Sequence, residues 1–186
     1  MYKYLLIITC LGIFACNSQS NTQSFENAWH YSPAHNNLII DHNCQSLITK
    51  YQYILTGLSN KDSLYLNNAT KDLIKISDSL LGLNLVKDSL LNHSWSNGLT
   101  NLHAELQGIL AADNPNELNM AVHMTGVQML NMLAEIGYKE HVIYIFNVND
   151  HKYEDGLIWF GLLKTARDPF HTDKHNMITA SQILQE

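Results

Sequence analysis

The chain has 186 residues and a formal net charge of −6, with 11 Lys and Arg residues in total. The basic residues form no cluster, which excludes a typical nucleic-acid-binding surface because such surfaces need grouped Lys and Arg. The length is sufficient for one domain with a single hydrophobic core. The sequence contains no P-loop, G-x-S-x-G, G-x-G-x-x-G or H-E-x-x-H motif, so we expect a protein that is not an enzyme.

Residues 1–16 are typical of a bacterial lipoprotein signal peptide. Lys3 supplies a short positive region, and Leu5–Phe14 forms an apolar stretch that is too short to span a bilayer. The following Ala15-Cys16 pair resembles the lipobox, in which a small residue precedes a cysteine that is lipidated. The alternative is an ordinary signal peptide that is cleaved nearby. We predict that lipidated Cys16 anchors the protein in the cell envelope, in the outer membrane and facing the periplasm, because no acidic run marks surface display.

The mature chain is predicted to begin with a flexible tether over residues 17–36, which are rich in Asn, Ser, Gln and Thr. The folded domain is expected over residues 37–186. Once Cys10 has left with the signal peptide and Cys16 carries lipid, Cys44 remains as the single cysteine, so no internal disulfide is possible. Cys44 falls on an apolar helical stripe, which favours a buried thiol over an intermolecular bridge or a metal ligand.

Apolar residues recur at intervals of three and four through most of the domain, which is the period of an amphipathic helix. The pattern predicts helices over residues 37–58, 63–81, 87–112 and 115–136. The last of these has the clearest start, because Asn114 is a capping residue, Pro115 suits the first helical position and Glu117 suits the third. Short connections between the four helices predict a mainly α fold built on an up-down four-helix bundle.

After Gly137 the pattern changes. Residues His141–Val148 are rich in β-branched and aromatic side chains, and Leu157–Leu163 forms a second apolar run after a polar turn. Together they predict a C-terminal β-hairpin or extended segment that packs against the bundle. A loop through Pro169 is then expected to lead to a last short helix over Asn176–Leu184.

Histidine and methionine side chains near the C-terminus are the best candidates for a metal site. The chain has 10 histidines, and His171, His175 and Met177 lie within seven residues of one another. Imidazole and thioether groups suit copper, and imidazole also suits zinc. If this segment is helical, His171 and His175 share one face and can chelate one ion, with Asp173 and His151 completing the site and His141 as the alternative to His151. The alternative is a loop of exposed histidines that binds no metal.

Four methionines lie on the fourth predicted helix. Met129 and Met132 share a side with its apolar residues and are predicted to be in the core. Met120 and Met124 lie on the other side, where they either form a thioether pair for Cu(I) or fill gaps against a neighbouring element. Arg167, the only arginine of the chain, is expected to act as a structural clamp rather than as an anion site.

Several short motifs suggest a family. They are Tyr51, Tyr144, Trp159, Asp168-Pro169-Phe170 and Met177. Through them, residues 37–186 resemble an uncharacterised bacterial periplasmic domain, the domain of unknown function numbered 3347. This domain occurs in small lipoproteins and as an extension of heavy-metal efflux adaptor proteins, so the resemblance implies a role near a metal efflux or homeostasis system.

The chain departs from that family at two positions that matter for metal chemistry. Members often have Cys-Pro-Met after the strand and Cys-Gly after the last methionine, whereas this chain has Asn147-Val148-Asn149 and Ala180-Ser181. Asn is a poor substitute for a thiolate ligand. Two hypotheses follow: a lipoprotein that binds or buffers copper or zinc through a site rebuilt from His171, His175 and Met177, or an envelope interaction and scaffold lipoprotein that binds no metal.

Overall fold

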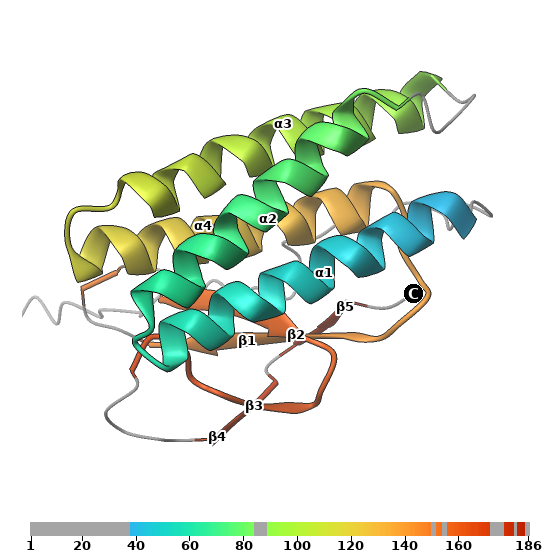
Figure 1. Cartoon of the computed structure of the whole chain (residues 1–186). Helices are drawn as coiled ribbons and strands as arrows, with labels where there is room; N and C mark the ends of the chain where they lie inside the picture. The colour runs from blue at the N-terminus through green and yellow to red at the C-terminus, as the bar shows by residue number, and fades with distance from the viewer. Residues whose placement is uncertain are drawn as a thin grey trace, which may run out of the picture.

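The computed structural model describes residues 38–83, 89–149, 152–153, 156–171, 177–180 and 182–184. In this part of the chain four helices come first and five short strands follow (Figure 1). The helices are α1 (Leu38–Ser59), α2 (Ser63–Leu81), α3 (Ser89–Ala111) and α4 (Pro115–Glu135). The strands are β1 (Ile143–Val148), β2 (Leu157–Gly161), β3 (Thr165–Arg167), β4 (Met177–Thr179) and β5 (Gln182–Leu184). The prediction of a mainly helical chain followed by a small antiparallel β unit is confirmed.

The ends of α4 follow from local sequence. The side chain of Asn114 accepts hydrogen bonds from the backbone N–H groups of Asn116 and Glu117, as an N-cap residue should. The Glu117 carboxylate in turn accepts from the backbone N–H of Asp113 at 3.0 Å. At the other end Gly137 adopts a φ of 68°, which is a left-handed conformation that ends helices and favours glycine.

The four helices pack mainly against their neighbours in sequence, and α1 also contacts α4. Their inward faces form one continuous core with the strands, and Cys44, Met129 and Met132 are buried in it as the sequence predicts. The close approach of α3 to α4 needs a glycine, since a Cβ on Gly98 would lie 2.5 Å from Cγ of Met132. None of the described helices is both long enough and apolar enough to cross a membrane.

The predicted hairpin is present as the antiparallel pair β1 and β2, in which Tyr144 lies opposite Gly161 and Val148 opposite Leu157. Gly156 precedes β2 with a φ of 74°, a conformation that glycine adopts without strain. β5 pairs antiparallel with the other edge of β1, so the strand order is β2-β1-β5. β3 and β4 form a separate two-stranded antiparallel sheet.

The predicted last helix over Asn176–Leu184 is wrong. Met177–Thr179 is the strand β4 and Gln182–Leu184 is the strand β5. Strand β5 supplies hydrogen-bonding partners for the edge of β1 that β2 leaves open, with Ile143 opposite Leu184, and the Leu184 side chain is buried by the pairing. Because nine residues form at most a short helix, this pairing and the core contact outweigh the local helical preference.

The three-stranded sheet lies against α1 and α4 (Figure 1). Phe160 of β2 stacks on Tyr51 of α1 with ring centroids 4.6 Å apart, and the Gln52 side-chain amide donates to the Phe160 carbonyl at 2.9 Å. On the α4 side, the backbone N–H of Ile158 donates to Nδ1 of His123 at 2.8 Å. These contacts hold β2 against the helices. The turn after β3 packs on β2, because the ring of Phe170 meets that of Trp159 edge-to-face with centroids 5.7 Å apart.

Candidate functional site

The turn Asp168–His171, directly after β3, holds a short network of polar contacts. The Asp168 carboxylate is buried, and its Oδ1 accepts from the backbone N–H of Phe170 at 2.8 Å and of His171 at 3.3 Å. Pro169 has no N–H to satisfy, so it suits the position between them. The Asp168 side chain therefore stabilises the turn by accepting hydrogen bonds from the backbone of the residues that follow it.

The second carboxylate oxygen of the same residue holds an imidazole. Asp168 Oδ2 lies 2.7 Å from Nδ1 of His171, whose side chain is half-buried. A carboxylate that accepts from Nδ1 fixes the ring orientation and the tautomer, and in that tautomer Nε2 is the nitrogen with a lone pair that a metal ion could use. Carboxylate–histidine pairs of this kind orient the imidazole ligands of metal sites.

His171 lies at the wall of a hollow of about 540 Å³ between the end of β1, the Asp168–His171 turn and β4. The lining residues are Val148, Asn149, Asp168, His171, Met177, Ile178 and Thr179. Two of the predicted metal ligands, His171 and Met177, thus line the same hollow although Met177 belongs to a strand and not to a helix. The other two predicted ligands, His151 and His175, lie outside the described residues.

Within the described residues, no three His, Cys, Asp or Glu side chains come close enough together to hold a metal ion. The described part of the hollow provides one imidazole backed by a carboxylate and one thioether. Imidazole with thioether is a soft donor set, which suits copper better than it suits hard cations such as magnesium or calcium.

Cys44 does not act as a soft donor in this fold. The side chain is fully buried and forms no disulfide. Burial raises the pKa of the Cys44 thiol well above its usual value, and the carboxylates of Asp41 and Glu140 raise it further. Because a thiol must lose its proton to bind a metal, the metal-ligand interpretation of Cys44 is disfavoured.

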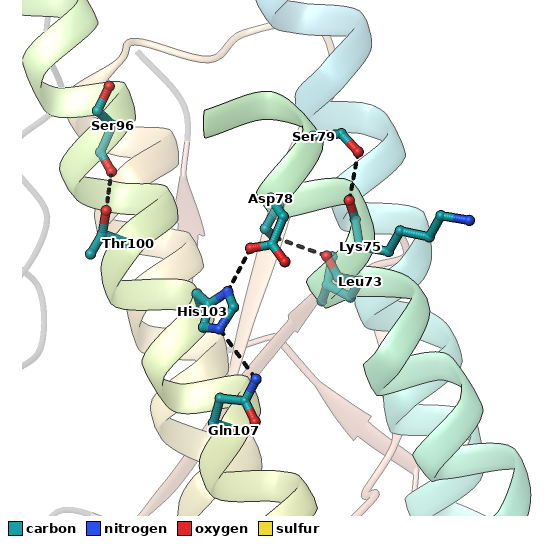
Figure 2. Close-up of polar contacts among 9 residues, drawn as sticks. Leu73, Lys75, Asp78, Ser79, Ser96, Thr100, His103 and Gln107 are labelled. Atoms are coloured by element: carbon teal, nitrogen blue, oxygen red, sulfur yellow. Dashed lines mark hydrogen bonds and ion pairs between the residues drawn. The ribbon is translucent and has the colours of Figure 1, made fainter. Parts of the chain in front are cut away.

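A second histidine–carboxylate pair joins α2 and α3 (Figure 2). His103 Nδ1 lies 2.7 Å from Oδ1 of Asp78, and its Nε2 lies 3.2 Å from the side-chain nitrogen of Gln107. Both ring nitrogens are engaged by protein groups, so this imidazole has no nitrogen left for a metal. The pair therefore links α2 to α3 through partly exposed side chains.

The role of His123 was not anticipated from the sequence. It is buried in α4, and its Nδ1 accepts the Ile158 N–H. One feature of the sequence could have indicated that His123 is buried. Gly126 and Leu130, three and seven residues after His123, are small or apolar and lie with it on a second buried face of α4. On the same helix Met120 is exposed and Met124 is half-buried.

Arg167 lies in β3, opposite Met177 of β4. It lines a second hollow of about 520 Å³ together with Gln52, Trp159 and other residues of α1 and β2. Met177 lines this hollow as well as the one beside His171, so the two hollows adjoin at the start of β4.

Comparison of the chain with models of protein families, with curated proteins and with solved structures gave no match. The resemblance seen in the sequence stays a prediction.

Proposed function

We propose that the protein is a non-enzymatic lipoprotein, anchored through Cys16 in the outer membrane and facing the periplasm, that binds or buffers copper or zinc near an efflux or homeostasis system. The observation that supports the metal role best is the 2.7 Å contact between Asp168 Oδ2 and His171 Nδ1 at the wall of a hollow that Met177 also lines. The envelope assignment rests on the lipobox-like Ala15-Cys16 pair.

The pair is suited to metal binding for two reasons. The carboxylate holds the imidazole in one orientation, so less conformational freedom is lost when Nε2 coordinates an ion. It also stabilises the Nδ1–H tautomer and makes Nε2 a stronger donor. Replacing such a carboxylate partner in metal proteins typically lowers metal affinity by about 10- to 100-fold.

We assign the remaining ligand positions to His175 and His151. His175 follows His171 by four residues, and His151 follows Asn149, which lines the hollow, by two. With Met177 the set contains three imidazoles and one thioether, which provides four donors for Cu(I), Cu(II) or Zn(II). This set replaces the thiols that the resembling family often carries.

The test is a competition titration of Cu(I) and Zn(II) into the mature chain, residues 17–186 without lipid, beside a triple variant His171→Ala, His175→Ala, Met177→Ala. A control variant removes histidines elsewhere: His42→Ala, His93→Ala, both exposed in the fold. Tight stoichiometric binding that is lost in the first variant and kept in the control supports the proposal. Weak metal binding that is equal in all three proteins contradicts the proposal.

A second candidate is an interaction or scaffold lipoprotein that binds no metal. It is favoured by Leu162 and Leu163, two exposed apolar side chains between β2 and β3 that border the 520 Å³ hollow. Such side chains at a hollow are typical of a surface that a protein partner covers. Cross-linking in intact cells should join the same partner protein to the wild type and to the metal-ligand triple variant. The Leu163→Asp variant should give no such cross-linked product.

We also infer an up-and-down order of the four helices. Short connections, such as residues 60–62 between α1 and α2 and residues 112–114 between α3 and α4, support it. The contacts between helices that are neighbours in sequence support it as well.

A further inference from the structure

Four large aliphatic side chains are exposed at one end of the helical layer. Leu38 and Ile39, in the first turn of α1, are 84% and 59% exposed; Leu83, just after α2, is 49% exposed; Leu90, in the first turn of α3, is 79% exposed. The start of α1, the end of α2 and the start of α3 lie at the same end of the molecule (Figure 1). We call these four side chains the apolar end.

Exposure by itself does not select a partner for this surface. Leu64 is 71% exposed in the first turn of α2, and α2 begins at the opposite end of the helical layer (Figure 1). The apolar end differs from Leu64 in one respect, which is its place relative to the N-terminal chain. The polypeptide that comes from Cys16 reaches the described fold at Leu38, within the apolar end itself.

We propose that the apolar end rests on the lipid surface that holds the Cys16 anchor, so that the domain has a fixed orientation on the membrane. This inference rests on the proposed lipid anchor and adds the surface that contacts the bilayer. Residues 17–36 connect the anchor to the fold. A chain of twenty residues spans at most about 70 Å when extended, and about 25 Å on average when flexible.

These lengths favour the apolar end over the rest of the molecule. α1 has 22 residues and is therefore about 33 Å long. Leu64 follows the far end of α1, so it lies about that distance from Leu38, where the anchored chain enters the fold. A tether of this length keeps the apolar end at a high effective concentration next to the bilayer. Weak partition of a few leucine side chains is then sufficient for docking, because the anchor has already supplied the loss of translational freedom.

The charge near the apolar end is compatible with a bilayer that contains anionic lipids. The first turn of α3 contains no acidic residue, and Asp41, the acidic residue in the first turn of α1, is buried. Among the described residues, the exposed charged side chains near this end include Asp78 in the last turn of α2, which pairs with His103 of α3, and Glu135, Lys139 and Glu140 in and after α4.

The test uses the full lipidated protein, purified from the envelope fraction and reconstituted in vesicles of phosphatidylethanolamine and phosphatidylglycerol. Leu90→Cys and the matched control Leu64→Cys each receive a nitrobenzoxadiazole fluorophore, since Cys16 carries the lipid and the Cys44 thiol is buried. We expect a blue-shifted emission at position 90 that brominated acyl chains quench. At position 64 we expect emission typical of water and no quenching.

Each other outcome overturns one part of the proposal. If mass spectrometry finds lipid on Cys16 and neither fluorophore is quenched, docking is refuted and the anchor stands. If the fluorophores at positions 90 and 64 are quenched equally, the fixed orientation is refuted. A blue shift at position 90 that depends on protein concentration and not on bromination assigns the surface to a second copy of the chain. If Cys16 carries no lipid, the anchor is refuted. The labelled protein is then mixed with the same vesicles, and a fluorophore at position 90 that stays unquenched refutes docking as well.

Discussion

The backbone N–H of Ile158 in β2 donates a hydrogen bond to Nδ1 of the buried His123 in α4 across 2.8 Å. β2 is an edge strand of the three-stranded sheet, so this N–H has no strand partner on that side. A buried donor without a partner is costly, and the imidazole satisfies it. His123 therefore belongs to the attachment of the sheet to the helices and not to a metal site.

Replacing His123 with Leu should destabilise the fold by about 1–3 kcal/mol, because the buried Ile158 N–H would lose its acceptor. His123→Asn is the matched control, since the Asn side-chain oxygen takes a position similar to that of Nδ1. Urea unfolding of the mature chain, followed by circular dichroism, measures both variants. Equal stability of the Leu and Asn variants would show that the hydrogen bond contributes nothing.

Two glycines in helices should respond in opposite directions to alanine. A Cβ on Gly57 in α1 would lie 2.8 Å from backbone atoms of Leu66, which cannot move aside easily, so Gly57→Ala should destabilise the fold. A Cβ on Gly108 in α3 would meet the Cβ of Ala121 at an ordinary 3.6 Å. Gly108→Ala should therefore stabilise the fold by about 0.5–1 kcal/mol through helix propensity. Thermal unfolding of both variants tests the contrast, and a gain in stability from Gly57→Ala would contradict the packing.

The Cys44 thiol should be unreactive in the folded protein. Its pKa is raised by burial, so at pH 8 it stays protonated, whereas an unfolded cysteine with a pKa of about 8.5 is partly ionised. In residues 17–186 this is the single cysteine. Ellman's reagent should detect no fast-reacting thiol in buffer and one thiol per chain in guanidinium. A fast reaction in buffer would mean that this part of α1 opens easily.

Asp168→Asn tests the carboxylate behind His171. We expect metal affinity to fall by about 10- to 100-fold, because Asn lacks the charge that fixes the Nδ1–H tautomer. The side-chain oxygen of Asn still accepts from the Phe170 and His171 N–H groups, so the turn should persist. Asp78→Asn makes the same change beside His103 and should leave affinity unchanged.

The same titrations have a defined pH dependence. Imidazole must be neutral to bind a metal, so affinity should fall as the pH drops below about 6.5. A site without histidine ligands would not show this fall. Equal affinity of wild type and Asp168→Asn at every pH would remove Asp168 from the site.

Much of the helical part could be predicted because its determinants are local. The cap formed by Asn114 and Pro115 placed the start of α4 at the observed residue, and the three-to-four spacing of apolar residues predicted the burial of Cys44. The hairpin of β1 and β2 was also predicted, from two β-branched and aromatic runs on either side of a polar turn. In each case the signal lies within a few turns of helix or one turn of chain.

The tertiary structure alone decided the C-terminal strands and the chemistry of the candidate site. Residues 177–179 and 182–184 carry a weak helical pattern, and their strands form only with partners outside the segment: β3, which ends ten residues before β4, and β1, which ends more than thirty residues before β5. The hydrogen bond from Ile158 to His123 and the hollow that Met177 shares with His171 depend in the same way on distant segments, whereas the contact of Asp168 with His171, three residues apart, is local. Local spacing sets helix periodicity, but hydrogen bonds between distant segments form only after the core has brought them together, so no pattern in the sequence encodes them directly.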